Sequence, residues 1–512
     1  LYLSKYPEDP EVLERLALAS LAVPESRPDY LQNAIMGYRR LLRMREDDAD
    51  LYRRLVKLYF QVGDFSEANY IAGRWVSKYP TEPEAREWEA RALRALRQPA
   101  DALQKLKDFF SDPATAEVAR KHVRLHEIIA ELYLNGEVPA EGSKLREQLA
   151  LEWMNRAVEE NPDSAEAHVQ RARLVTQLRR RNLPALTLGD PRADLLEASR
   201  LNTPDLRVRL QLADAWLAVH DLERAEAELQ AAEQLQHPEY QFEFERQDVL
   251  QVKHQLRARL LIESNQQANR VADLPQKARE VADAALAELD TRHRLMLMPT
   301  IVNLYLVAKR VDKAEELLNQ YEAAVEDQKK GNPELVERVA CLKALLATGK
   351  NDPFRAIEEL EGILRVGNPR DPDVWRLLGY AYLGASQDRR ALRAFEQYLT
   401  LRQGDTSTAL DVTRLHYRLG NWPSVRRLAA ELEPVLPNNL DVRLMRLEAA
   451  IRLKPSDADA AALLEEVRSL SAEHKDRPEL PLLEAMILTQ QKRPQEAIAR
   501  LQQAEKTLSN PG

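Results

Sequence analysis

The chain has almost no cysteine and little glycine. Its 512 residues include one cysteine, Cys341, and 15 glycines. A single thiol excludes an internal disulfide framework and a cysteine-rich zinc site. Alternating runs rich in Val, Ile and Thr are also nearly absent, so a β-sheet has little to form from. The abundant residues, Ala, Leu, Glu, Arg and Gln, lose little in a helix, and the composition therefore predicts an all-α protein.

Neither a surplus of positive charge nor a long apolar run is present. The 74 Lys and Arg residues are interspersed with 82 Asp and Glu residues, and the net charge is −8 at pH 7. This balance gives no support to a nucleic-acid partner. The most apolar stretch, residues 295–308, contains Pro299 and Asn303, and it is shorter than the roughly 20 residues that cross a bilayer. We expect no membrane insertion by this segment. The cytoplasm and the periplasm both stay open as compartments, with any signal or anchor outside the given chain.

The common catalytic motifs are also missing from the sequence. We find no G-x-x-x-x-G-K-[ST] or G-x-G-x-x-G phosphate loop, no H-E-x-x-H zinc motif and no G-x-S-x-G nucleophile motif. We therefore expect neither enzymatic activity nor a cofactor. Cys341 lies in the apolar run ERVACLKALLA, which predicts a buried packing residue instead of a reactive thiol.

Two histidines have the spacing of metal ligands. His122 and His126, in KHVRLHEIIAELY, lie four residues apart, which puts them on one face of a predicted helix. A closed zinc site needs about four ligands, and no third ligand is apparent nearby. The pair is a weak metal candidate, and the alternative is a surface or groove position.

The strongest pattern in the chain is an internal repeat. The stretches 49–80 and 372–403 can be laid over each other, with Ala49 and Pro372 as position 1. Apolar or small residues then fall at positions 4, 7, 11, 20, 24 and 27 of both stretches: Tyr52, Leu55, Tyr59, Ala68, Ala72 and Trp75 in the first, and Trp375, Leu378, Tyr382, Ala391, Phe395 and Tyr398 in the second. The first three positions form one stripe of a first helix, and the last three form one stripe of a second helix.

This pattern resembles the tetratricopeptide repeat (TPR) family, whose signature is W-x2-L-G-x2-Y, then Ala, Phe and Pro over 34 residues. It recurs in the stretches 206–237, 295–326 and 406–437 and from residue 478 onward. The matching residues there are Leu212, Ala213, Trp216, Ala225 and Leu229; Ile301, Tyr305, Ala314, Leu318 and Tyr321; Val412, Gly420, Ala429, Leu432 and Pro437; and Ala485, Ala497, Leu501 and Ala504. The resemblance implies a right-handed superhelical solenoid of about 13 TPR-like helix-turn-helix units.

The regularity of the repeats divides the chain. Residues 1–7 are expected to end a preceding helix, and residues 8–113 to form N-terminal TPR units. Residues 114–290 are expected to form degenerate TPR-like units, with inserts near 136–146 and 180–193, and their exact register stays open. Regular units are expected over 291–437 and C-terminal TPR-like units over 438–512.

The repeat pattern also predicts how each helix pair packs. Small residues at positions 8 and 20, here Gly379 and Ala391, let two helices approach closely, and large residues such as Phe395 fill the space around them. The conspicuous aromatic residues fall on these positions, so we interpret them as core residues and not as a ligand-stacking surface.

The resemblance further implies a concave groove lined by positions 2, 5, 9, 12 and 13 of each first helix. Carried over to this chain, these positions give two basic and aromatic clusters: Arg53, Lys57, Phe60, Arg91 and Arg94 in the first, and Arg376, Tyr380, Arg414, Tyr417 and Arg418 in the second. Arginine next to aromatic residues is typical of peptide hot spots, and arginine binds carboxylates with two hydrogen bonds.

These observations favour a non-enzymatic scaffold of the bacterial adaptor kind, which binds a peptide or helix of a partner protein in the groove. Two alternatives stay open. The chain is the repeat region of a larger export, polysaccharide-related or glycosyltransferase-type protein, or it is a self-assembling structural array. The ends LYLSKYP and TLSNPG motivate the first alternative, and open solenoid ends, which can stack on other copies, motivate the second.

Overall fold

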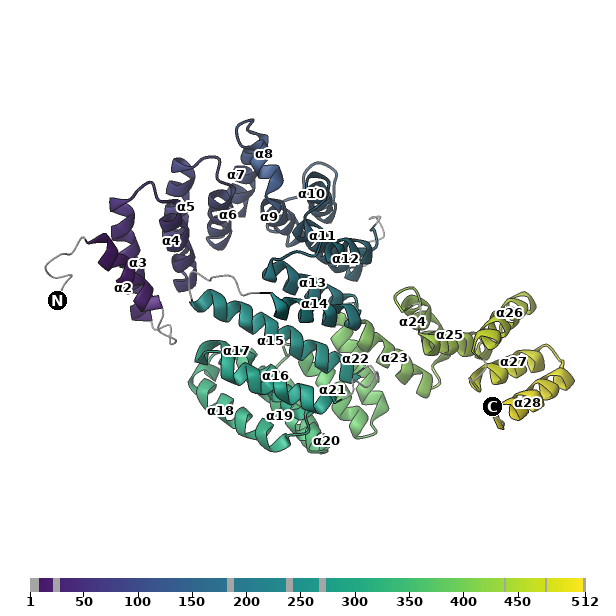
Figure 1. The fold of residues 1–512 in the computed structure, drawn as a ribbon. Coiled ribbons are helices and arrows are strands. Elements are labelled where there is room, and N and C mark those ends of the chain that lie inside the picture. The colour runs from purple at the N-terminus through teal and green to yellow at the C-terminus, as the bar shows by residue number, and fades with distance from the viewer. Residues whose placement is uncertain are drawn as a thin grey trace. The chain divides into compact units, whose positions relative to one another are not determined.

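The structure is a computed structural model that describes residues 9–21, 28–181, 188–235, 243–266, 273–402, 404–436, 439–474 and 477–509. These residues form 27 α-helices, labelled α2 to α28, and no β-strand (Figure 1). The all-α class predicted from composition is confirmed. Among the helices described, none combines the length and apolar character of a membrane-spanning segment.

The chain forms two compact units, Leu1–Tyr321 and Glu322–Gly512. The first unit contains α2 (Pro10–Leu21), α3 (Pro28–Met44), α4 (Ala49–Val62), α5 (Phe65–Lys78), α6 (Pro83–Ala95), α7 (Pro99–Ser111), α8 (Ala116–Lys121), α9 (Val123–Leu134), α10 (Arg146–Glu160), α11 (Ala165–Arg180), α12 (Pro191–Arg200), α13 (Leu206–Ala218), α14 (Leu222–Gln234), α15 (Glu243–Gln266), α16 (Leu274–Glu288) and α17 (Thr291–Val307). Helix α18 (Val311–Lys329) crosses the boundary between the units.

The second unit continues with α19 (Pro333–Gly349), α20 (Pro353–Val366), α21 (Asp373–Gly384), α22 (Asp388–Leu401), α23 (Thr406–Arg418), α24 (Trp422–Leu432), α25 (Leu440–Arg452), α26 (Asp457–Glu473), α27 (Glu479–Gln490) and α28 (Pro494–Ser509). In both units, consecutive helices pack as hairpins, for example α4 with α5, α13 with α14, α19 with α20 and α21 with α22. The first helices of successive hairpins also touch, as in the pairs α4 with α6 and α19 with α21. Stacked helix-turn-helix pairs of this kind are the arrangement that the repeat pattern of the sequence predicts.

Local sequence signals set the ends of these helices. At the start of α4, the side chain of Asp48 accepts a hydrogen bond from the Asp50 N–H at 3.1 Å, and Asp64 accepts one from the Glu67 N–H at 3.1 Å at the start of α5. Gly63 lies between the two helices with φ of +78°, a left-handed conformation that ends a helix and favours glycine. The sequence Val62-Gly63-Asp64 therefore specifies the turn of this hairpin.

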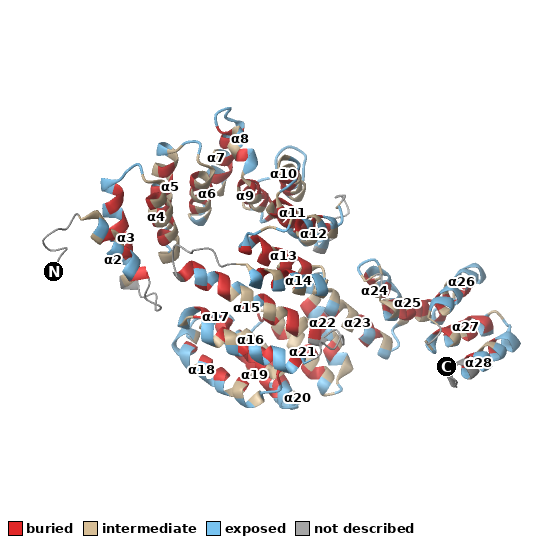
Figure 2. Ribbon diagram, in the orientation of Figure 1, coloured by how far each residue is buried: buried red, intermediate tan, exposed pale blue. Residues whose placement is uncertain are grey.

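The signature residues of the repeats form the core between paired helices, which Figure 2 shows as buried stripes along the facing helix sides. Trp75 and Trp216 are both fully buried, and so are the small residues Ala68, Ala225 and Ala391. Residues 301, 305, 314, 318 and 321 of the predicted repeat 295–326 are also buried. The interpretation of the aromatic signature residues as core is confirmed at these positions.

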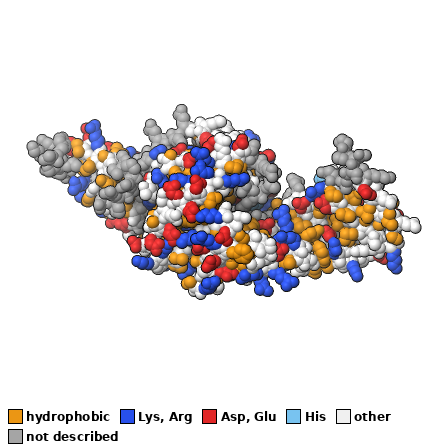
Figure 3. All heavy atoms as spheres, turned by 90° about the horizontal axis from the view of Figure 1, so that it is seen from below, with side chains coloured by type: hydrophobic (Ala, Val, Ile, Leu, Met, Phe, Trp, Pro, Cys, Tyr) orange, Lys and Arg blue, Asp and Glu red, His pale blue; other side chains and the backbone are white. Residues whose placement is uncertain are grey.

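Two signature residues on the helix stripes differ from this expectation, and Gly420, in the turn after α23, is exposed as well. Trp375 is only partly buried at the edge of its hydrophobic cluster. Leu501, in the last helix, is 37% exposed. It lies in α28, in the terminal hairpin, where Leu482 and Ile498 are also exposed. No later hairpin among the described residues covers this hairpin. Figure 3 shows hydrophobic side chains gathered over these C-terminal repeats.

Gly379 lies on the side of α21 that packs against α22. A Cβ atom added to Gly379 would lie 2.6 Å from Cδ1 and 2.7 Å from Cζ of Phe395, whose ring is fully buried. Glycine is therefore required because the ring of Phe395 occupies the volume that any side chain at position 379 would need.

Two connections between helices lie near the predicted inserts of residues 114–290. A loop joins α9 to α10 near residues 136–146, and a second connection joins α11 to α12 near 180–193, although residues 182–187 lie outside the described residues. The predicted end of a preceding helix at residues 1–7 and the signature residue Pro437 also lie outside them.

Candidate functional site

The first helices of the first unit make a continuous row. Each of α4, α6, α9, α11, α13 and α15 contacts the next. The predicted groove residues Arg53, Lys57 and Phe60 lie on α4, and Arg91 and Arg94 lie on α6. We call the predicted groove residues of these two helices, together with Trp88, the α4–α6 face.

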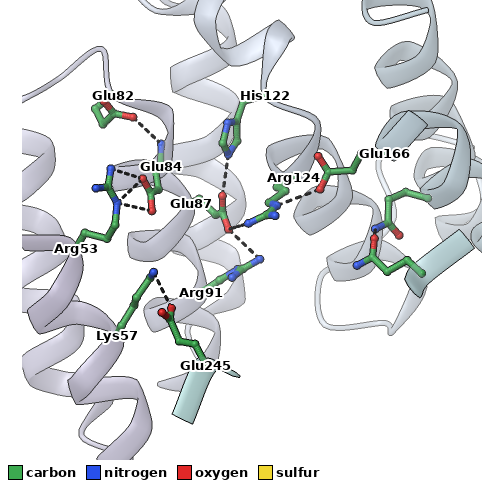
Figure 4. Close-up of polar contacts among 12 residues, drawn as sticks. Arg53, Lys57, Glu82, Glu84, Glu87, Arg91, His122, Arg124, Glu166 and Glu245 are labelled. Atoms are coloured by element: carbon green, nitrogen blue, oxygen red, sulfur yellow. Dashed lines mark hydrogen bonds and ion pairs between the residues drawn. The ribbon is translucent and has the colours of Figure 1, made fainter. Parts of the chain in front are cut away.

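Arg53 connects the first helices of two successive repeats. Its Nε donates hydrogen bonds to both carboxylate oxygens of Glu84, at 2.9 and 2.8 Å (Figure 4). Its Nη1 lies 3.1 Å from Asp50. Glu84 is 31 residues further along the chain, close to one repeat length. The hydrogen bonds that Arg53 donates to Glu84 raise the pKa of the Arg53 guanidinium above its usual value. Arg53 therefore holds two repeats together by binding a carboxylate, which is also the group that it would bind in a ligand.

Lys57 and Phe60 differ from Arg53 in what they contact. The Nζ of Lys57 lies 2.8 Å from Glu245 at the start of α15, and the lysine side chain is 19% exposed. The ring of Phe60 packs edge-on against Phe65 and against Trp88, with centroid distances of 5.4 and 5.0 Å. Both predicted groove residues are therefore partly covered by other parts of the first unit.

Glu87 on α6 is the centre of a polar cluster that links α6 to α9. Its side chain is 2% exposed, and it lies 2.7 Å from His122 Nε2, 2.8 Å from Arg91 and 3.8 Å from Arg124 (Figure 4). Burial disfavours the ionised carboxylate, but the hydrogen bond from His122 and the two arginine charges together lower the pKa of Glu87. Arg91 is thereby held by Glu87 and also lies over the ring of Trp88, 5.2 Å from its centroid.

Arg94 lies in the last turn of α6 and binds acidic residues beyond it. Its Nε donates hydrogen bonds of 2.9 Å to both oxygens of Glu137, in the loop after α9, and its Nη1 pairs with Glu131. The predicted cluster on α4 and α6 is therefore a set of residues in which every cation pairs with a carboxylate of the same unit.

Glu127 is an acid of this row whose surroundings oppose its charge. It lies on α9, and burial together with the nearby carboxylates of Glu131 and Glu166 raises its pKa to about 7. The pKa of Glu127 in the folded chain is therefore above 4.5, the usual value for this carboxyl in the unfolded chain. Folding favours the protonated carboxyl, so this contribution to stability is complete below about pH 4.5 and is lost as the pH rises through 7.

We expect Glu127→Gln to leave the free energy of unfolding nearly unchanged at pH 4.5 and to raise it at pH 8, by on the order of 2 kcal/mol. Glutamine keeps the size of the side chain and carries no charge to desolvate. Urea unfolding at the two pH values measures the difference. Glu159→Gln, at an exposed position on α10, is the matched control and should show no pH-dependent gain. An equal effect of Glu127→Gln at both pH values would contradict the assignment.

The second predicted cluster lies on α21 and α23 of the second unit. The hydroxyl of Tyr380 donates a hydrogen bond of 2.9 Å to Asp411, and the hydroxyl of Tyr417 donates one to Glu448 on α25. Both bonds join residues 31 positions apart, so each joins the first helix of one repeat to that of the next. Burial and the bonded carboxylate raise the pKa of each tyrosine.

The three arginines of this cluster differ in exposure. The side chain of Arg376 is 32% exposed, and it pairs with Asp373 at 3.1 Å. Arg414 pairs with Asp411 at 3.4 Å and Arg418 with Asp388 at 3.2 Å, and their side chains are 51% and 53% exposed. We call Arg376, Tyr380, Arg414, Tyr417 and Arg418 the α21–α23 cluster. Arg414 and Arg418 are more exposed than the other predicted groove cations of both clusters.

The structure does not bring His122 and His126 together as metal ligands. One helix was predicted through both, but α8 ends at Lys121 and α9 begins at Val123, with His122 between them in an extended conformation. His122 binds Glu87, whereas Nε2 of His126 lies 3.0 Å from Glu160. His126 is also fully buried, so the alternative of a surface or groove position is wrong for it. In the described part of the chain, no group of three or more metal-binding side chains is present.

Cys341 is buried in α19, as predicted, with 7% of its surface exposed. Burial is the largest cause that raises the pKa of its thiol, and the nearby charges of Asp371 and Asp373 add to it. A thiol that stays protonated at neutral pH is a poor nucleophile.

Sequence reasoning named the cations and aromatic residues but did not predict which carboxylates pair with them. These acids are Glu84, Glu87, Glu131, Glu137, Asp411 and Glu448. For Glu84, Asp411 and Glu448, the signal was available, because each lies 31 residues after its partner and close to one repeat length. For Glu137, in the irregular loop between α9 and α10, no repeat register was available to pair it with Arg94.

No protein-family model matches this chain, and no curated protein matches it in sequence. Among solved structures, the chain is similar to one described as the APC/C hetero-tetramer Cut9–Hcn1, with 12% identity, a TM-score of 0.37, and coverage of 98% of this chain and 94% of that one. It is also similar to yeast Tom70, with 14% identity, a TM-score of 0.33, and coverage of 90% and 98%. A thermophilic TPR protein of Thermus thermophilus, TTC0263, shares 24% identity at a TM-score of 0.29 and covers 42% of this chain over its full length.

Proposed function

We propose that this chain is a non-enzymatic protein–protein interaction scaffold, which binds an extended or helical segment of a partner along the first helices of its repeats. One observation carries the proposal. Tyr380 and Tyr417, at predicted groove positions of successive first helices, donate hydrogen bonds that join each first helix to the next. A face built in this way is held in a fixed geometry before a partner arrives.

The α21–α23 cluster is the part of this face best suited to recognition. Arg414 and Arg418 are each about half exposed, so a partner carboxylate can reach them. Their present partners, Asp411 and Asp388, are 22% and 29% exposed, and exposed ion pairs of this kind contribute little stability, at most about 1 kcal/mol. A partner that brings its own carboxylates can therefore displace them, which fits an acidic segment or a chain terminus as the ligand.

We expect Arg414→Glu/Arg418→Glu to abolish the binding of such a partner, with a loss of at least roughly tenfold in affinity, because each substitution replaces an attractive contact with a repulsive one. The measurement is quantitative mass spectrometry of proteins crosslinked to wild type and variant in source cells, followed by titration of the recovered partner against both purified chains.

The matched control is Arg389→Glu/Arg393→Glu, a charge reversal of the same size at exposed positions on α22, the second helix of the same hairpin. The control should retain the partner. Equal recovery of all crosslinked proteins by wild type, control and Arg414→Glu/Arg418→Glu would contradict the proposal.

A further inference from the structure

The first turn of α15 contacts a face that lies far from it in sequence. Phe244 is 9% exposed and belongs to the same hydrophobic cluster as the cores of α4, α5 and the start of α6. It is the member of this cluster that lies furthest from the others in sequence. Next to it, Glu245 lies 2.8 Å from Lys57, 188 residues earlier, with its side chain 10% exposed. Figure 4 shows Glu245 pointing at Lys57, beside the Arg53–Glu84 and Glu87 contacts.

The remainder of α15 is held by other elements of the first unit. The Asp290 N–H donates to Gln247 at 2.9 Å, His254 lies 3.0 Å from Glu288, and Arg259 lies 2.8 Å from Asp214. Val249, Leu256 and Leu260 belong to a second hydrophobic cluster, with the cores of α11 to α14. The position of α15 is therefore fixed without the contact to α4, and the Phe244–Glu245 pair is an additional contact made by one turn.

The surface that receives this turn has the composition of a recognition site. Phe60 and Trp88, which pack against the same hydrophobic cluster as Phe244, form an edge-on aromatic pair, and Arg91 lies over the Trp88 ring. Lys57 supplies a positive charge on a side chain that is 19% exposed. Aromatic residues and cations around a partly covered apolar centre are the usual anchors of protein interfaces.

We propose that Phe244 and Glu245 are an internal ligand of the α4–α6 face, and that the same face binds partner segments in which an aromatic residue is followed directly by an acidic residue. This inference rests on the proposed scaffold function and names the partner class of its N-terminal face. The acid pairs with Lys57, and the ring enters the cluster that Phe244 now occupies. Because the internal pair is tethered, it competes at a high effective concentration, of the order of millimolar for short flexible connections.

The test uses the full chain and a fluorescent peptide of residues 243–250, EFERQDVL. We expect the peptide to bind Phe244→Ala/Glu245→Gln at least roughly tenfold more tightly than wild type in fluorescence anisotropy, because the variant no longer fills the face. Adding Lys57→Glu to that variant should remove the gain. Equal binding to wild type and variant, or a gain that survives Lys57→Glu, would overturn the proposal.

Two further measurements keep the result decisive. A peptide that retains the Phe-Glu pair but has its other residues shuffled should bind within about threefold of the original, since the anchors carry most of the affinity, and its failure to bind would overturn the assigned partner class. Glu245→Gln alone, which preserves the size of the side chain, replaces the double variant if that variant unfolds early on heating, and it should give a smaller gain of the same sign. The Arg414→Glu/Arg418→Glu variant tests the proposed scaffold function in the other unit. If that variant loses its partner but the peptide does not bind the α4–α6 face, only the inference about the α4–α6 face is rejected.

Discussion

We expect Gly379→Leu to destabilise the second unit by about 3 kcal/mol, at the upper end of the usual cost of overpacking a core. The reason is the ring of Phe395, which is fully buried and lies 2.6 Å from the position that a Cβ at residue 379 would take, measured at Cδ1. Neither the ring nor the helix backbone can move without disturbing α21 and α22. Differential scanning calorimetry should show a lower melting temperature for this unit, with the first unit unchanged.

A glycine in the neighbouring hairpin provides the matched control. Gly362 lies within α20, and a Cβ added there meets no atom within 4 Å. Gly362→Leu therefore removes the helix penalty of glycine without a clash at Cβ and should be neutral or stabilising by up to about 1 kcal/mol. Gly379→Ala combined with Phe395→Leu should recover part of the stability lost by Gly379→Ala alone, because the smaller side chain frees the space. A melting curve of Gly379→Leu that matches wild type would contradict this packing.

The second large effect is expected for Arg209→Met, which should cost about 3 to 5 kcal/mol in the first unit. Arg209 and Glu228 form an ion pair of 2.9 Å between α13 and α14, and their side chains are only 7% and 9% exposed. Arg209 also donates hydrogen bonds to the carbonyl of Thr203, at 3.2 Å, and to Asn202. Methionine fills much of the same space but leaves the Glu228 carboxylate buried without its partner.

A double substitution separates this cause from a loss of packing. Arg209→Met/Glu228→Leu removes both charges and should recover most of the lost stability, because a buried ion pair and an apolar pair of similar volume are often close in free energy. Arg207→Met, at an exposed position two residues earlier on α13, should change stability by no more than about 0.5 kcal/mol. Urea unfolding of wild type, each single variant at the ion pair and the double variant gives the coupling energy, and additive effects of the two substitutions would contradict the buried-pair assignment.

The repeat architecture was largely predictable because its signals are local and periodic. The spacing of Tyr52, Leu55 and Tyr59 defines one stripe of α4, and the same positions recur in α21. Small residues at positions 379 and 391 predicted the close approach of paired helices, and the ring of Phe395 against Gly379 confirms it. The break at His122 was not predicted, because nothing in the run KHVRLHEII disfavours a continuous helix strongly enough.

The sequence by itself therefore determined the helix class, the hairpin unit, the core positions and which cations lie on first helices, since each follows from contacts within one repeat or between neighbours. Only the tertiary structure decided which residues outside the repeat register those cations bind. Arg53 and Glu84 are one repeat apart, so their contact follows once the register is known. Lys57 and Glu245 are 188 residues apart with no periodic relation, and their contact exists because the stacked repeats bring the beginning of α15 back to α4. A pairwise contact of that kind depends on the summed geometry of many helices, which no short stretch of sequence encodes.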